Sequence, residues 1–194
     1  MSAIIQILAS VLNHTPDRLT VAGTEAVNVH NQLRDLPFYH TLTHRPDQLP
    51  VNVGDAVFIE ADLTPAATDG QIHLRLVGGA NLGPRPTRQD ARGQPVLCGG
   101  MNLILLDGHL ATDLQVRRLD DDTAVANFSV RLGALPGFLE VSAYGRNALG
   151  LEGGRKGDRV ILPGRLLHAQ RPGSGGRMHR YDRIEVLRTS VGGR

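Results

Sequence analysis

The sequence contains no tryptophan, and aromatic residues make up only 4% of it. Cys98 is the single cysteine, which excludes an intrachain disulfide and a cysteine cage for a metal. No apolar run approaches the ~18 residues that a membrane-spanning helix needs, and the N-terminus lacks the positive segment of a secretion signal. We therefore expect a cytoplasmic protein that makes no contact with a membrane.

Patterns of catalysis and of cofactor binding are also missing. The sequence has no G-x-S-x-G motif and no phosphate-binding P-loop. The eight histidines have no metal-ligand spacing, and Asp120-Asp121-Asp122 would alternate sides on a strand, which favours a solvated turn over a metal site. Cys98 lies beside Gly99-Gly100 with no candidate base near it in the sequence. These absences predict a binding protein without a cofactor rather than an enzyme.

The charge is distributed unevenly along the chain. Its 194 residues suffice for one large domain or two small ones, and the net charge is only +2. Residues 1–97 carry 7 Arg against 9 Asp and Glu, a net of −2. Residues 98–194 carry 14 Arg and Lys against 10 Asp and Glu, a net of +4. A surface for anions is therefore expected in the second half.

The stretch 101–145 consists of short apolar strands joined by tight turns. An apolar run at 103–106 ends at Asp107-Gly108, and residues 123–130 alternate apolar with small polar side chains. A Gly/Pro loop at 133–137 leads into the next apolar segment. This spacing predicts an antiparallel barrel rather than a helical or βαβ fold. Residues 146–153 contain enough Ala and Leu for a short helix.

Four motifs in this half resemble the oligonucleotide-binding (OB) barrel of bacterial single-stranded DNA-binding proteins, the SSB family. They occur in the family's order. The matching residues are Met101, Asn102, Gly108, Leu110 and Asp113 in the first strand, Thr123 to Ser129 in the second, Phe138 to Gly145 in the third, and Lys156-Gly157-Asp158 with Gly164-Arg165-Leu166 at the fourth. The resemblance implies a five-stranded barrel that binds single-stranded DNA.

The first half carries a weaker copy of the same unit. Its strands are predicted at residues 3–12, 18–29, 36–42, 53–63 and 70–76. Val53-Gly54-Asp55 aligns with Lys156-Gly157-Asp158, and Leu36-Pro37-Phe38-Tyr39 aligns with the segment 135–138, which indicates a degenerate internal repeat. The tandem arrangement resembles the two-barrel SSBs of the Deinococcus–Thermus group, whose Leu-Pro-aromatic-Tyr-His segment is matched by residues 36–40.

Residues 80–97 contain three Pro and two Gly without periodicity, which predicts a linker. The expected organisation is all-β, with two tandem five-stranded OB barrels. An N-terminal domain occupies residues 1–79, the linker 80–97, and an SSB-like C-terminal domain 98–190. A basic hairpin loop is expected at 170–177.

Binding of single strands requires cations for the phosphates and flat side chains on which the bases stack. Any single arginine could also be a solvated surface charge with no role in binding. Phe128 and Phe58 are expected to lie in the core and not to stack on bases. Phe138 and Tyr144 are six residues apart, so an ideal strand presents them on one face. The candidate cations are Arg117, Arg118, Arg131, Arg165, Arg171, Arg177 and Arg180, and the candidate platforms are Phe138, Tyr144, Tyr181, Phe38 and Tyr39.

The chain departs from the SSB pattern in its aromatic residues and at its C-terminus. Phe138 and Arg171 stand at positions where the family usually has Trp, and the loop at 133–137 is short. Losing stacking platforms, each worth roughly 1–3 kcal/mol, leaves affinity dependent on phosphate contacts and therefore on salt. The final residues are basic, without the family's acidic, Phe-terminated tip, so we expect an accessory or paralogous SSB.

The resemblance implies sequence-independent binding of single-stranded DNA in replication, repair or recombination, near the bacterial nucleoid. It also implies a homodimer that brings four OB barrels together, with replication or repair proteins as further partners. A primosome-like subunit, whose barrels mainly bind proteins, is the alternative that the scarcity of aromatic residues favours. An RNA binder is the second alternative, because stacking grooves discriminate weakly.

Overall fold

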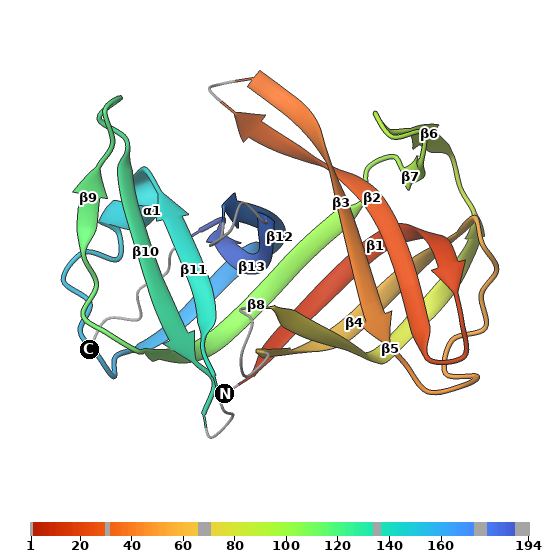
Figure 1. Ribbon diagram of the computed structural model, residues 1–194, viewed down its shortest axis with the longest axis horizontal. Coiled ribbons are helices and arrows are strands. Elements are labelled where there is room, and N and C mark those ends of the chain that lie inside the picture. The colour runs from red at the N-terminus through yellow and green to blue at the C-terminus, as the bar shows by residue number, and fades with distance from the viewer. Residues whose placement is uncertain (1, 30–31, 66–70, 134–136, 173–177, 189–194) are drawn as a thin grey trace. The chain divides into compact units, whose positions relative to one another are not determined.

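The computed structural model describes residues 2–29, 32–65, 71–133, 137–172 and 178–188 (Figure 1). Among these residues strands dominate, and the one helix, α1 (Arg146–Leu149), is a single turn in the predicted 146–153 segment. The backbone divides into two compact units, one of Ile5–Asp62 with Leu74–Asn102 and one of Met1–Ile4, Leu63–His73 and Leu103–Arg194. No helix within the described ranges is long and apolar enough to cross a bilayer.

The first barrel is a closed ring of five strands. Antiparallel pairing joins β2 to β1 and to β3, and the neighbours β5, β4 and β1 complete the circuit. Closure comes from a parallel pairing of β3 with β5, in which Leu42 lies opposite Leu74. The strands are β1 (Ala3–His14), β2 (Arg18–Val29), β3 (Gln32–Thr43), β4 (Asp55–Pro65) and β5 (Ile72–Pro84).

The second barrel repeats this connectivity. β8 pairs antiparallel with β10 and β12, β10 pairs with β11, and β12 pairs with β13. A parallel pairing of β11 with β13, Val141 opposite Ile184, again closes the ring. The strands of the ring are β8 (Met101–Leu110), β10 (Ala124–Arg131), β11 (Leu139–Tyr144), β12 (Arg159–Pro172) and β13 (Met178–Val186). The short strand β9 (Val116–Arg118) pairs with β10 outside the ring. Five-stranded barrels of this kind are OB folds, as the sequence predicts.

Alternation of side chains builds each barrel interior. In β8 the inward residues Ile104, Leu106 and Leu110 are at most 3% exposed, while Leu105 points out. Each fully buried aliphatic side chain contributes about 1.5–3 kcal/mol. Gly108 occupies an inward position that has no room for a side chain, since a Cβ there would lie 2.5 Å from Val130 Cγ1 and 2.7 Å from the Arg131 carbonyl oxygen. Barrel curvature at this point therefore requires glycine.

The internal repeat is confirmed at the turn that precedes the fourth strand of each barrel. Gly54 has φ of 95° and Gly157 φ of 89°, a region that favours glycine. The backbone N–H groups of Asn52 and Arg155 each donate to the Oδ2 of the aspartate three residues later, at 2.9 Å in both turns. Both glycine N–H groups donate, at 2.9 Å, to a backbone carbonyl in the first strand of their own barrel, Gly54 to that of Val11 and Gly157 to that of Leu110.

The segment 80–97 is folded rather than a structureless linker. β5 runs to Pro84, and β6 (Thr87–Gln89) pairs antiparallel with β7 (Pro95–Leu97). Val96 and Leu97 are 0% and 5% exposed. The prolines of this segment indicated a linker, but they are compatible with strands because they lie at strand ends and between strands, where no backbone N–H is needed for sheet pairing. The limits of the expected domains, 1–79 and 98–190, stay predictions.

Candidate nucleic-acid interface

The outer face of β9, β10 and β11 carries four of the candidates in the second barrel. Residues directly opposite one another in antiparallel strands share a face. Arg117 on β9 lies opposite Val125 on β10, which lies opposite Tyr144 on β11. Tyr144 is half-buried and Arg117 is exposed, so a cation and a ring flank a buried Val125.

Polar side chains fill the middle of this face. Ser142 Oγ donates to Asn127 Oδ1 at 2.8 Å, and Ser129 Oγ donates to Glu140 Oε1 at 2.9 Å. Both pairs are directly opposite in the register of β10 and β11. These hydrogen bonds tie the side chains of the two strands together in the middle of the face.

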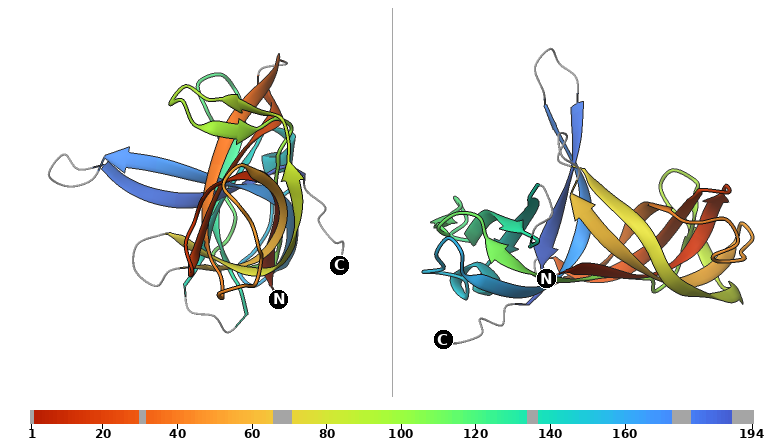
Figure 2. Two further views of the ribbon diagram at one scale, coloured as in Figure 1. Left: turned by 90° about the vertical axis from the view of Figure 1, so that its right-hand side faces the viewer. Right: turned by 90° about the horizontal axis from the view of Figure 1, so that it is seen from below.

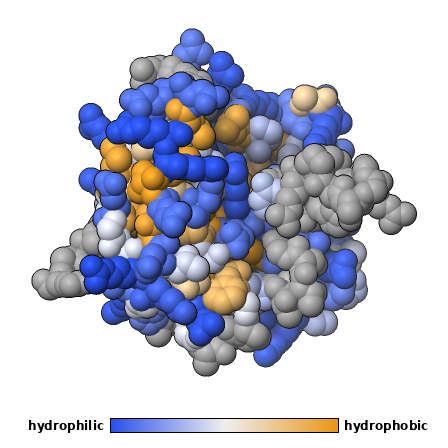
Figure 3. All heavy atoms as spheres, turned by 60° about the vertical axis from the view of Figure 1, so that its left-hand side comes forward, coloured by the Kyte–Doolittle hydropathy of each residue, from blue (hydrophilic) through white to orange (hydrophobic). Residues whose placement is uncertain are grey.

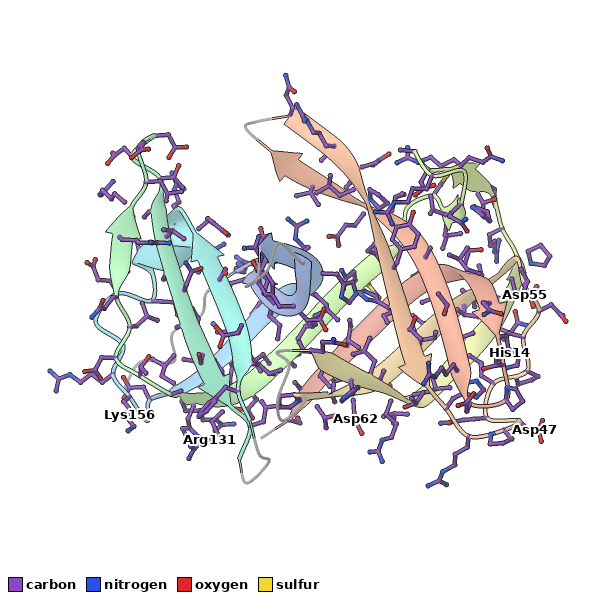
Figure 4. The ribbon with its side chains drawn as sticks, viewed as in Figure 1. His14, Asp47, Asp55, Asp62, Arg131 and Lys156 are labelled. Carbon is purple, nitrogen blue, oxygen red and sulfur yellow. The ribbon has the colours of Figure 1, made fainter. Side chains whose placement is uncertain are left out.

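Arg131, labelled in Figure 4, lies at the other end of the same face, and Phe138 contacts it there. Arg131 ends β10, and Phe138 stands one residue before β11. The Arg131 Cζ lies 5.2 Å from the centre of the Phe138 ring, which is a cation–π distance. Phe138 is 46% exposed, so its second ring face is open to a ligand. A stacking platform and a positive charge are thus presented together.

Figure 3 turns the side of the molecule that carries β9, β10 and β11 toward the viewer. Apolar surface is visible there among hydrophilic groups. Such a mixture suits a flexible polyanion, because the bases need apolar area and the phosphates need cations.

Two of the candidate arginines of this barrel are already paired. Arg165, 5% exposed, places its Nη2 at 3.1 Å from both carboxylate oxygens of Glu185. Its prediction as a phosphate contact is therefore replaced by a role inside the protein. Arg118 is exposed and donates to Asp122 Oδ1 at 2.9 Å. Exposed pairs of that kind are worth about 0–1 kcal/mol, so Arg118 can exchange its partner.

The ribbon of β12 and β13 carries the remaining candidates of the second barrel (Figure 2). Tyr181 is half-buried and lies opposite Ala169. Arg171 and Arg180 stand in the backbone ladder opposite His179 and Gln170. Arg177 lies outside the described residues.

Arg183 is a functional candidate that sequence reasoning missed. It alternates with Tyr181 and Glu185 on the outer side of β13, since Asp182 and Ile184 between them are buried. Its Nε is buried and has no hydrogen-bond partner among the described residues. The basic and apolar alternation of β13 was the available signal, and it points to Arg183 as much as to Arg180.

The two candidates of the first barrel do not form an open platform. Phe38 is 7% exposed and stacks on His40, with ring centres 5.3 Å apart. A Cβ on Gly23, its opposite residue, would lie 2.7 Å from Phe38 Cζ, so the ring fills the space that this glycine leaves. Phe38, predicted as a stacking residue, is therefore a core side chain in this structure and not an exposed ring.

Tyr39 faces outward but is engaged. Its hydroxyl donates to Asp90 Oδ2, and the Arg92 guanidinium lies 6.0 Å from its ring centre. Burial, followed by the contact with the Asp90 carboxylate, raises the pKa of Tyr39 to about 12. The same hydrogen bond from Tyr39 lowers the pKa of Asp90, which keeps it a carboxylate.

No three His, Cys, Asp or Glu side chains that could hold a metal ion gather among the described residues. The β9–β10–β11 face offers rings, arginines and hydroxyls. Together with the closed five-stranded rings, it defines an oligonucleotide-binding-barrel protein.

Comparison with known proteins specifies the family. The chain is 35% identical over 191 residues to the single-stranded DNA-binding protein of Thermus thermophilus, covering 88% of this chain and 73% of the relative. It is 29% identical over 196 residues to that of Thermus aquaticus, again covering 88% and 73%. No protein-family model matches the chain.

A solved structure shares the fold over the whole chain. The crystal structure of the wild-type single-stranded DNA binding protein from Thermus aquaticus superimposes with a TM-score of 0.72 at 24% identity, covering 100% of this chain and 94% of that one. The chain belongs to the single-stranded DNA-binding protein family, which confirms the resemblance drawn from the four motifs.

Proposed function

We propose that this protein binds single-stranded DNA, without sequence preference, on the β9–β10–β11 face of its second barrel. The observation that carries the proposal is the pairing of a cation with a ring at both ends of one sheet face. Arg131 lies 5.2 Å from the ring centre of Phe138, and Arg117 shares a cross-strand row with Tyr144. The relatives from Thermus are single-stranded DNA-binding proteins, which supports the proposal.

The chemistry of this face explains the absence of sequence preference. Every base has a π surface, so stacking on Phe138 or Tyr144 does not select one base. Arginines contact phosphates, which are the same in every nucleotide. Because the sequence has no Trp and few other aromatic residues, phosphate contacts supply a large share of the affinity. Binding is therefore expected to weaken steeply as salt rises.

An anisotropy titration with a labelled single strand of about 30 nucleotides tests the proposal at two salt concentrations. Salt-sensitive binding that duplex DNA fails to compete supports it. Equal binding to duplex, or binding at low salt only, contradicts it and favours the protein-partner alternative. A matched RNA strand as competitor separates the DNA binder from an RNA binder.

We also propose a homodimer, assembled through the outer face of β8 and β12. Leu105 is 55% exposed and Ile161 42% exposed. Their opposite residues, Pro163 and Asp107, put both side chains on one face of the paired strands. Among the described residues of this unit nothing covers the patch, and a second copy of the chain would bury it and bring four barrels together.

Light scattering after size exclusion tests this assembly. Leu105→Asp should convert a dimer to a monomer, whereas Leu119→Asp, at a turn residue of similar exposure (43%), should not. A monomeric parent chain contradicts the homodimer and leaves the patch for another protein. An accessory role in replication, repair or recombination stays a prediction that the scarcity of stacking residues supports.

A further inference from the structure

The β6–β7 hairpin, residues 85–98, is attached to the strand of the first barrel that corresponds to β10. Leu97 pairs in parallel with Gly23 on β2, and Thr24 Oγ1 donates to the Leu97 carbonyl at 3.1 Å. Thr24 is 2% exposed, and Val96 and Leu97 are equally closed to solvent, at 0% and 5%. This hairpin is therefore packed on β2 (Figure 1) rather than tethered near it.

Side chains of the hairpin also reach β3, on the far side of β2. In the sheet, β2 lies between β7 and β3. Even so, Asp90 Oδ2 accepts a hydrogen bond from the Tyr39 hydroxyl, and Arg88 Nη1 donates to Asp35 Oδ2 at 2.9 Å. Both β3 residues share a face with their partners on β2, so these contacts pass over the outer face of β2. Ala22, opposite Tyr39 on that face, is 0% exposed.

The turn of the hairpin holds Asp90 in place for this contact. Asp90 Oδ1 accepts from the backbone N–H groups of Arg92 and Gln94, at 2.9 and 2.8 Å. Asp90 N–H donates to the Gln94 carbonyl, and Gly93 adopts a φ of 72°. One carboxylate oxygen thus organises the turn while the other accepts from Tyr39. The Asp90 side chain therefore both stabilises the turn of the hairpin and connects the hairpin to β3.

The corresponding face of the second barrel is open. Phe138 is 46% exposed, and Arg131 and Asn127 are exposed as well. The short strand β9 pairs beside β10 and adds Arg117 to the open face. In the first barrel the aromatic side chain at the face, Tyr39, is half-buried and is hydrogen-bonded to the Asp90 carboxylate, which also repels phosphate.

We infer that the β6–β7 hairpin is an intramolecular cap that keeps single-stranded DNA off the β2–β3 face, so that each chain takes up DNA with its second barrel alone. This inference rests on the proposed function of the second barrel. The cap also conceals a latent site, since its removal would free the Tyr39 ring for stacking.

Hydroxyl-radical footprinting of the full chain, with and without oligothymidylate, tests the cap. In the wild type, DNA should protect Phe138 and Tyr144 and leave Tyr39 unchanged. Asp90→Ala removes the carboxylate that holds Tyr39. Tyr39 should then become more reactive in the free protein and should be protected when DNA binds. Each chain should also occlude more nucleotides. Asp120→Ala, which removes one exposed carboxylate from a different turn, should behave as wild type.

Tyr39→Phe provides a milder opening, because it removes only the hydroxyl that contacts Asp90 and keeps the ring. It should shift the footprint in the same direction as Asp90→Ala. Protection of Tyr39 in the wild type, or an unchanged footprint in both variants, would overturn the cap. Loss of protection at Phe138 and Tyr144 in every protein would instead overturn the proposed function, so the two failures are distinguishable.

Discussion

The two barrels share a backbone plan and differ in what lies on it. Each is closed by a parallel pairing of its third and fifth strands, and each enters its fourth strand through the same Gly–Asp turn. The second barrel leaves the face of its second and third strands open, whereas the first carries the β6–β7 hairpin there. Repeating a fold therefore does not repeat a binding site.

A single residue accounts for the opposite fates of Phe38 and Phe138. The first barrel reads Leu-Pro-Phe and the second Leu-Pro-Gly-Phe. Phe138 stands one position further from the Leu-Pro pair than Phe38 does, and because side chains on a strand alternate, this shift reverses the face to which the ring points. Phe38 is accordingly 7% exposed and Phe138 46%. Gly137, which stands in the place of Phe38, has a φ of 90°, which a bulkier residue would adopt only with strain.

The largest expected effect is the loss of both rings on the open face. Phe138→Ala with Tyr144→Ala should weaken single-strand binding by about 2–4 kcal/mol, since stacking contributes roughly 1–3 kcal/mol per base. Anisotropy titration measures the change, with thermal unfolding to show that the barrel is intact. The matched control Tyr39→Ala should leave affinity within about threefold. An equal loss from Tyr39→Ala would abolish the contrast between the barrels.

The arginines of the second barrel should separate into two kinds. Arg165→Ala leaves Glu185 partly buried without its partner and should lower the free energy of unfolding by about 3 kcal/mol. Arg131→Ala should leave stability nearly unchanged and reduce the slope of log affinity against log salt by about 1. Denaturant unfolding and salt titrations measure the two effects. A stable Arg165→Ala protein with a reduced salt slope would return Arg165 to the DNA contacts.

Alkaline pH should weaken the cap, which is the smallest effect. The pKa of Tyr39 in the folded protein is about 12, above the ordinary value of about 10. The stabilising contribution of the neutral phenol is therefore complete below pH ~10 and lost as pH rises through 12. Absorbance at 295 nm should follow this ionisation, and Asp90→Ala should lower the pKa. A Tyr39 that ionises near 10 in the wild type would contradict the buried contact.

Much of the backbone could be predicted from the sequence, because strand alternation and Gly–Asp turns are local signals. The predicted strand 18–29 coincides with β2. The hairpin at 85–98 could not be predicted, since its short strands contain no hydrophobic period and its stability comes from contacts with β2 and β3. The burial of Phe38 could not be predicted for the same reason, because only its pairing with Gly23 shows that the ring points inward.

The sequence predicted the types of residue in the candidate site better than it predicted which individual residues belong to it. Phe138, Tyr144, Arg117 and Arg131 were selected from the sequence and lie on one sheet face. Arg165 matched a motif but is buried against Glu185, which requires knowledge of the register of β12 and β13. Charge and aromatic character can be read from the sequence, whereas availability to a ligand depends on distant neighbours.

Photocrosslinking tests the central claim most directly. Single strands substituted with 5-iodouracil are irradiated in complex with the full chain, and the crosslinked residues are identified by mass spectrometry. We predict crosslinks at Phe138 and Tyr144 and none at Tyr39. Crosslinks confined to residues of β2 and β3 would contradict the assignment of the site to the second barrel.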